Sequence, residues 1–235
     1  MSKHRYRLIS AIGIVVAIAL MGVGIVSMTR QGTEVFSGSD AGKAVASDTL
    51  EVSSARILEI EGAWDVTITN GKPAVQLKAS EKQLKNISFN QSGDRITLRQ
   101  NGPDLNLGNL GHAVRVEVAM PDIQEVRLSG AGSLNINDLK AKDLKLTVQG
   151  GCSVKTEGTT IENLVLRSEG ACNVDMADAS ITNAEVSLQG ASNATINMAG
   201  GTLAGQIEGV GHLAYSGSVS SENVRTEGLA KVERK

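Results

Sequence analysis

The sequence predicts an all-β protein, a right-handed parallel β-helix (a solenoid with about 20 residues per turn) behind an N-terminal transmembrane helix. Three observations lead to this prediction. A glycine-led pentapeptide recurs between residue 130 and the end of the chain, the positions around each glycine alternate between apolar and polar, and residues 8–28 form an uncharged, mainly apolar run.

The pentapeptide occurs six times, and its first glycines are separated by 20, 20, 20, 19 and 19 residues. With so short a repeat and no helical pattern inside it, each strand must pair in parallel with its equivalent one turn later, at a rise of roughly 4.8 Å per turn. A sharp bend repeated at one position of every turn needs a positive φ or a close backbone approach that a Cβ would obstruct. The predicted structural corner glycines are Gly130, Gly150, Gly170, Gly190, Gly209 and Gly228.

Positions two and four residues before each glycine, and four residues after it, are mostly apolar, as expected of strands with one buried face. These columns predict that Leu146, Leu166, Val174 and Leu188 face one continuous core. The residue directly before each glycine is polar in every copy and is predicted to face water. These residues are Ser129, Gln149, Glu169, Gln189, Glu208 and Glu227.

Residues 49–123 also read as strands, although no 20-residue period is visible there. The predicted strands are residues 50–52, 57–60, 66–69, 75–77, 87–89, 96–98 and 114–120, separated by glycine- and asparagine-containing turns. They form either wider first turns of the coil or a sheet packed against its start. One continuous domain over residues 49–235 is the simplest interpretation.

Two segments of the chain resemble a known family. The run from Val114 to Gly132 leads into the glycine repeats, and Leu58 to Gly71 is similar to the opening strands of the same family, the head GIN domain family of autotransporter-adhesin head domains. The resemblance covers about residues 50–235 and implies a fold more than an activity. Members often carry an acidic residue at the fourth position of the pentapeptide. This chain has Ser133, Ser153, Asn173, Asn193, His212 and Lys231 there, so an acidic ladder is absent.

Residues 1–30 predict a signal anchor. Lys3, Arg5 and Arg7 precede a 21-residue apolar run that would span roughly 31 Å as a helix, about the thickness of a bilayer core. The basic flank predicts a single pass through the cytoplasmic membrane, with the C-terminal domain periplasmic or extracellular. The alternative is a signal peptide that is cleaved, leaving a secreted protein. We favour the anchor because the apolar run is long for a signal peptide.

Residues 31–48 are small and polar and predict a flexible linker. With the four basic residues of the anchor set aside, the remaining 205 residues carry 19 basic and 25 acidic side chains. This mildly acidic balance gives no electrostatic basis for binding nucleic acid.

Cys152 and Cys172 occupy the same repeat position one turn apart, so the coil should stack them about 5 Å apart at Cα. A disulfide is one interpretation, since the domain is expected outside the cytoplasm. Stacked thiols are the favoured one, because the column holds small residues and neighbouring parallel strands hold their Cβ atoms in a strained geometry for a bridge. No metal, cofactor or catalytic site is predicted.

The outward columns of the repeats lack the clustered carboxylates and stacking aromatics of polysaccharide-cleaving β-helices, so we expect no enzyme. The leading hypothesis is a membrane-anchored, non-catalytic envelope domain that binds another macromolecule, in line with the adhesin name of the family. The alternatives are a self-associating structural element of the envelope and an envelope-sensing partner of a signalling system.

Overall fold

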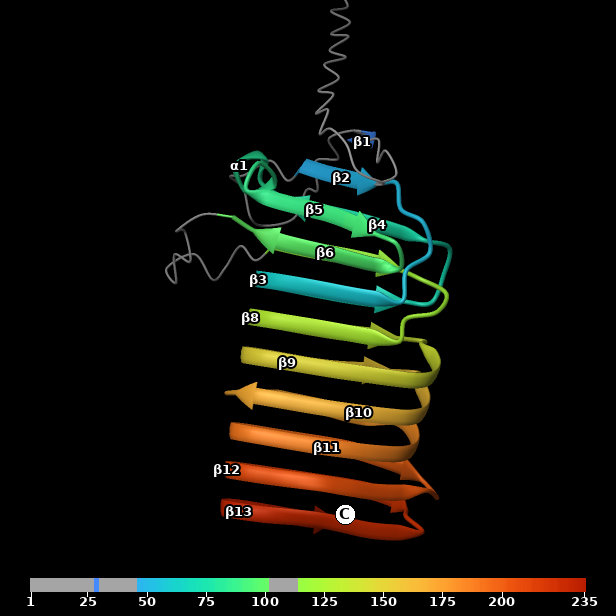
Figure 1. Ribbon diagram of the computed structural model, residues 1–235, viewed down its shortest axis with the longest axis vertical. Coiled ribbons are helices and arrows are strands. Elements are labelled where there is room, and N and C mark those ends of the chain that lie inside the picture. The colour runs from blue at the N-terminus through green and yellow to red at the C-terminus, as the bar shows by residue number, and fades with distance from the viewer. Residues whose placement is uncertain (1–27, 30–45, 102–113) are drawn as a thin grey trace, which may run out of the picture.

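The computed structural model describes residues 28–29, 46–101 and 114–235. Thirteen strands of one sheet and one short helix make up this part of the chain (Figure 1). The elements are β1 (Met28–Thr29), β2 (Ala46–Leu50), β3 (Ile57–Thr69), β4 (Ala74–Ala79), α1 (Glu81–Leu84), β5 (Ile87–Ser92), β6 (Arg95–Gln100), β7 (Val114–Ala119), β8 (Glu125–Asn137), β9 (Lys140–Glu157), β10 (Thr160–Gly170), β11 (Asn173–Ala199), β12 (Thr202–Ser218) and β13 (Ser221–Arg234).

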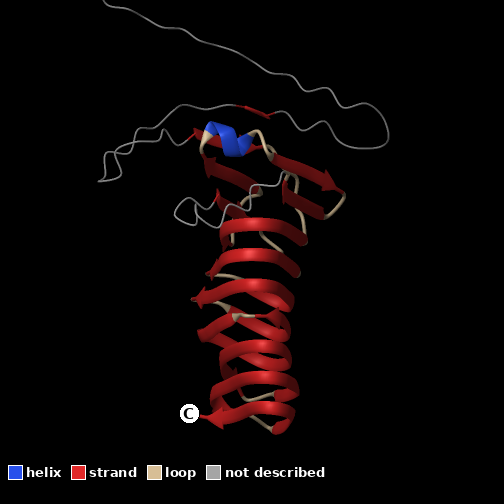
Figure 2. Ribbon diagram, turned by 90° about the vertical axis from the view of Figure 1, so that its left-hand side faces the viewer, coloured by secondary structure: helices blue, strands red, loops and turns tan. Residues whose placement is uncertain are grey.

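Strands β8 to β13 wind into a solenoid whose successive turns pair in parallel, as Figure 2 shows. The register joins each corner glycine to the next, from Gly130 opposite Gly150 to Gly209 opposite Gly228. With the turns above β8 the coil has about six turns of roughly 20 residues. The predicted all-β solenoid and its repeat length are therefore confirmed.

One face of every strand lines a continuous apolar core. Leu146, Leu166, Val174 and Leu188 are each at most 1% exposed and belong to this core, as the alternation predicts. None of the polar residues that directly precede the corner glycines is buried. Apolar and polar residues alternate because successive side chains of a strand point to opposite faces, and only the outer face of the wall contacts water.

The first turn of the coil lies further upstream than the glycine repeat indicates. β3 bends at Gly62 and pairs with β8 over its whole length, so that Gly62 lies opposite Gly130. On its other edge β3 pairs in parallel with β6 through residues 57–61 and with β7 through residues 64–69. β6 and β7 thus lie on one side of β3, above it. The next strand in the sequence, β8, lies on the other side of β3, below it. Of the two arrangements expected for residues 49–123, wider turns of the coil describe β3, β6 and β7.

A cap of reversed strands closes this end of the coil. β5 pairs antiparallel with β6, β4 pairs antiparallel with β7, and β2 adds antiparallel to β4. Between β4 and β5 lies α1, which the sequence interpretation did not include. Ser80 and Gln83 form a capping box at its start, so the Ser-x-x-Gln spacing was the available signal. The second expected arrangement, a sheet against the start of the coil, describes β2, β4 and β5.

Most of the predicted anchor, residues 1–30, and most of the predicted linker lie outside the described residues. Met28 and Thr29 form β1, which pairs antiparallel with β2, and β2 begins at Ala46, within the range assigned to the linker. In the part of the chain that the structure describes, no helix has the length and apolar character to cross a membrane.

Candidate functional site

A ladder of glycines runs along one edge of the coil and fixes its corner. Gly150 has φ +110°, and a Cβ built on it would lie 2.1 Å from the carbonyl oxygen of Gly130 in the turn above. At Gly170 φ is +114° and the corresponding oxygen, that of Gly150, is 2.5 Å away. Real Cβ atoms do not approach a backbone oxygen so closely, so both positions require glycine. All six predicted corner glycines occupy this ladder: Gly130, Gly150, Gly170, Gly190, Gly209 and Gly228.

The ladder is closed at its upper end by a side chain. Gln100 donates its amide N–H to the carbonyl of Ala63 at 3.0 Å and accepts the backbone N–H of Ala63 at 2.8 Å. The carboxamide of Gln100 therefore takes the place of a peptide group in a further turn. Trp64 is fully buried beside it and donates Nε1–H to the carbonyl of Glu61 at 2.9 Å.

Two residues after the glycine lies the column that contains the cysteines. Cys152 and Cys172 are free and buried, on neighbouring turns, and each thiol approaches the corner carbonyl of the turn above, at 3.8 Å and 3.6 Å. Ser192 occupies the same position and approaches the corner carbonyl of Gly170 at 3.5 Å. The contact with Cys172, together with burial, raises the pKa of the Cys152 thiol. The cysteines thus share the packing role of a serine, and whether they oxidise stays a prediction.

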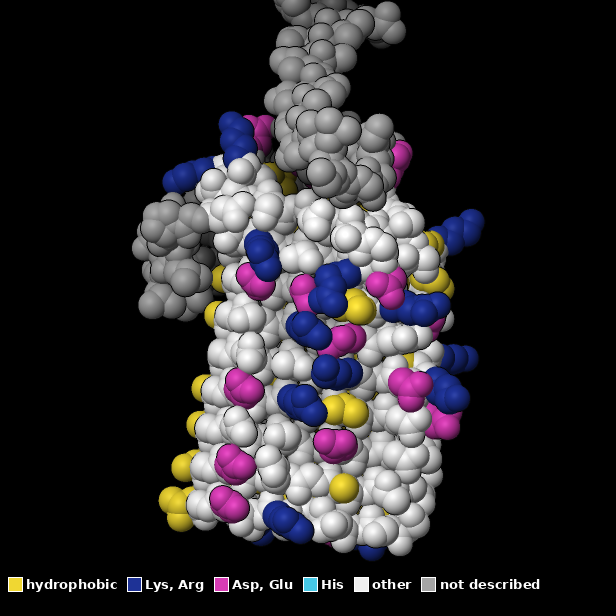
Figure 3. Space-filling model, viewed as in Figure 1, with side chains coloured by type: hydrophobic (Ala, Val, Ile, Leu, Met, Phe, Trp, Pro, Cys, Tyr) yellow, Lys and Arg dark blue, Asp and Glu magenta, His cyan; other side chains and the backbone are white. Residues whose placement is uncertain are grey.

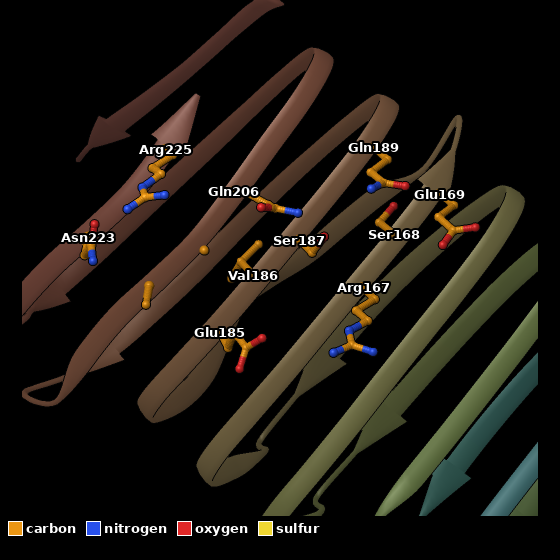
Figure 4. A pocket seen from close by; sticks show the side chains of 12 residues that line it. Arg167, Ser168, Glu169, Glu185, Val186, Ser187, Gln189, Gln206, Asn223 and Arg225 are labelled. Carbon is orange, nitrogen blue, oxygen red and sulfur yellow. The ribbon is translucent and has the colours of Figure 1, made fainter. Parts of the chain in front are cut away.

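The polar wall that ends at the glycine corner carries the candidate binding site. A shallow hollow of about 550 Å³ lies across β10 to β13, and Figure 4 shows the side chains that surround it. Its floor is low because the outward position of β12 is occupied by Ala204, where the neighbouring turns have Glu185 and Asn223. Gly205, which follows it, belongs to the column of Leu166 and Val186 and faces the core. Arg167 and Arg225 lie on opposite sides of the hollow, in one column three turns apart, which is roughly 14 Å at the spacing of paired strands.

The same wall carries a different arrangement of charge in its first turns. Glu59 binds Arg95 and also Arg127, at 2.9 Å in the latter pair, and Glu125 binds Arg127 at 2.8 Å and Lys145 at 2.9 Å. Figure 3 shows basic and acidic side chains interspersed over these turns. Burial opposes ionisation of Glu125, but hydrogen bonds from Lys145 and Arg127 prevail and hold its pKa below the usual range. These charges join one turn to the next.

The arginines at the hollow do not join neighbouring turns through ion pairs. Within the described part of the chain, Arg167 and Arg225 form no ion pair with a carboxylate. Both lie on the outer face and are exposed. A guanidinium presents a planar set of donors that matches a carboxylate or phosphate group, so an exposed and unpaired one is a ready contact for an acidic ligand. The sequence interpretation missed this contrast, because it treated the outward columns one turn at a time.

Among the described residues no group of three or more His, Cys, Asp and Glu side chains has an arrangement that could hold a metal ion. His212 is half-buried, and its Nε2 lies 3.2 Å from a carboxylate oxygen of Glu233 in the next turn, which also binds Lys231 at 2.9 Å. What the wall offers is a row of amides, hydroxyls and charges on a rigid frame.

A protein-family model matches residues 56–219, with the description "Putative auto-transporter adhesin, head GIN domain". The chain belongs to the head GIN domain family. This membership confirms the resemblance seen in the sequence, and the match includes β3, the part of the cap formed by β4, α1 and β5, and the solenoid through β12.

Solved structures share the head GIN fold of this chain. A "putative adhesin" from Bacteroides fragilis is 16% identical, with a TM-score of 0.56, and the match covers 83% of this chain and 98% of that one. A "putative lipid binding protein" from Parabacteroides distasonis is 14% identical, with a TM-score of 0.50 over 83% of this chain and 98% of that one. A "putative adhesin" from the same organism is 11% identical, also with a TM-score of 0.50, over 82% and 98%. No curated protein sequence matches the chain.

Proposed function

We propose that this head GIN domain is the binding part of an adhesin-like surface protein, and that it holds an acidic macromolecule of the cell surface without catalysis. The observation that supports the proposal is the hollow on the outer wall. There Arg167 and Arg225 lie exposed and form no ion pair with Glu169 or Glu185 of the same hollow, whereas the corresponding Arg127 of the first turns is paired. A rigid wall with two guanidiniums roughly 14 Å apart suits a polymer that presents acidic groups at intervals.

The proposal includes the topology predicted from the sequence. An uncleaved helix formed by the apolar run that starts at residue 8 and ends before Met28 of β1 holds the domain at the cytoplasmic membrane, with the coil in the periplasm or outside the cell, and the coil is right-handed. The basic flank at Lys3, Arg5 and Arg7 supports this orientation. Carbonate extraction of cells tests it, because an anchored chain stays at full length in the membrane pellet. Release of a chain that lacks residues 1–30 would contradict the anchor.

Adherence of coated beads tests the binding role. Beads carrying the full chain should adhere to cells of the source organism, and Arg167→Glu should lower adherence several-fold, because it places a repelling charge in the hollow. Lys142→Glu is the matched control, since it makes the same change of charge at an exposed residue outside the hollow. Equal losses in both variants would contradict the proposed site. Wild-type beads that adhere no better than albumin-coated beads would contradict the proposed function.

A further inference from the structure

The two ends of the coil differ in what covers their backbone. The inner edge of β13 pairs with β12 along 14 residue positions, from Ser221 to Arg234. Within the described residues no strand pairs with its outer edge (Figure 2). Leu229, at the corner of this last turn, is 81% exposed, and Val224 and Val232 are only partly buried. An edge of this length with uncovered apolar side chains is a template for another strand.

The opposite end does not offer such an edge to a coil that stacks in parallel. There β4 and β5 run against the direction of the turns, with β2 and α1 beyond them. A head-to-tail chain of copies would have to place β13 against this reversed cap. Pairing of β13 with β13 of a second copy uses the same surface twice and leaves both capped ends outside, which closes the assembly at two copies.

We propose that two copies of this chain join tail to tail through antiparallel pairing of their β13 edges, about a two-fold axis at Leu229. The charges of β13 support this register. With Leu229 opposite Leu229, Arg225 lies opposite Glu233 of the second copy, and Glu227 lies opposite Lys231 of the second copy. Both pairs occur twice by symmetry. All four of these residues are exposed and occupy outward positions, so each pair meets on the outer wall.

Neighbouring registers are disfavoured by the same residues. A shift of two positions one way places Arg225 opposite Lys231, and a shift the other way places Arg225 opposite Lys235 and Glu227 opposite Glu233. Like charges directly opposite each other on paired strands are destabilising. A shift by one position turns the outward residues of one copy toward the core of the other. In the proposed register the inward positions place Val232 opposite Thr226, Ala230 opposite Gly228 and Val224 opposite Arg234 of the second copy.

The pairing and the hollow share Arg225, whereas Arg167 belongs to the hollow alone. The carboxylate of Glu233 already forms an ion pair with Lys231 of its own chain at 2.9 Å. Arg225 of the second copy would add a second cation to this carboxylate at the junction. Arg167 lies in β10, three turns away from Arg225 of β13 in the same column, and is therefore outside the contact between the copies. Loss of adherence in Arg167→Glu and loss of pairing at β13 are therefore separate results.

Cysteine cross-linking of the full chain in detergent tests the junction. Directly opposed residues of antiparallel strands have Cα atoms about 4.5–5.5 Å apart, within the range of a disulfide. Leu229→Cys should therefore give covalent dimers on mild oxidation. Val210→Cys is the matched control, because Val210 lies in the same column one turn away, is 60% exposed, and would face its counterpart at roughly 14 Å. The wild-type chain measures any background from Cys152 and Cys172.

Charge reversal supplies the second measurement. In the Leu229→Cys background, Glu227→Lys and Lys231→Glu should each lower the yield of covalent dimer at least threefold, and the two together should restore most of it. Thermal unfolding of each variant shows whether the coil is intact. Dimers that form equally from Val210→Cys and Leu229→Cys, no dimer from Leu229→Cys in a folded chain, or a double reversal no better than the single ones would each overturn the proposal.

Discussion

The capped and the open end of this coil solve the same physical problem in different ways. A solenoid exposes unpaired backbone and an apolar core wherever it stops. At the upper end reversed strands cover the backbone, Trp64 fills the core and Gln100 continues the glycine corner with a carboxamide. At the lower end β13 is the last layer among the described residues, and its side chains are largely exposed. The comparison indicates that stability should be high near the cap and fall toward β13, where few buried contacts remain.

The largest effect is expected for a charge in the core. Leu166→Asp should lower the free energy of unfolding by about 3 kcal/mol or more, because a buried carboxylate there has neither water nor a cationic partner. Val232→Asp makes a similar change in the last turn, where the side chain is only partly buried, and should cost less than half as much. Urea unfolding of the full chain gives both values. Equal losses would mean that the last turn is as well covered as the middle.

Glycine substitutions extend the comparison along the corner. Gly150→Ala should cost at least about 1 kcal/mol, since its Cβ would meet a backbone oxygen at 2.1 Å and turns on both sides hold the strand in place. Gly228→Ala meets the carbonyl oxygen of Gly209 at 2.5 Å, but β13 can move away from β12. The second variant should therefore lose markedly less stability in thermal unfolding. A loss at Gly228 as large as that at Gly150 would contradict an open end.

These positions also show what the sequence can establish. The corner glycines, the core columns and the 20-residue turn are local properties that recur in every repeat. Gly150 and Leu166 could therefore be placed without a structure. Gly62 has the same role as Gly150, but its counterpart Gly130 follows 68 residues later. Strands β4 to β7, which lie between them in the sequence, are placed on the other side of β3 from β8, and no local pattern of the sequence indicates that order. The hollow at Ala204 and Gly205 was not predicted for a related reason, because it depends on the side chains of four neighbouring turns.

A smaller effect is expected at the cap itself. Gln100→Ala removes both hydrogen bonds to the backbone of Ala63 and should cost about 1–2 kcal/mol, as loss of partners for partly buried polar groups does. Gln149→Ala is the control, because the exposed amide of Gln149 donates to the Glu169 side chain and supports no backbone group. Thermal unfolding distinguishes the two. If both variants melt together with the wild type, Gln100 does not act as the cap of the corner.

Hydrogen exchange of the full chain, measured at two protein concentrations, tests the difference between the ends most directly. At low concentration the amides of β13 should exchange much faster than those of β3, β6 and β7, because β13 has one paired edge and few buried contacts. Raising the concentration should slow exchange in β13, where a second copy adds, and should leave the capped end unchanged. Exchange in β13 that is as slow as in β3 at low concentration, or that is independent of concentration, would contradict an open end that receives a second copy.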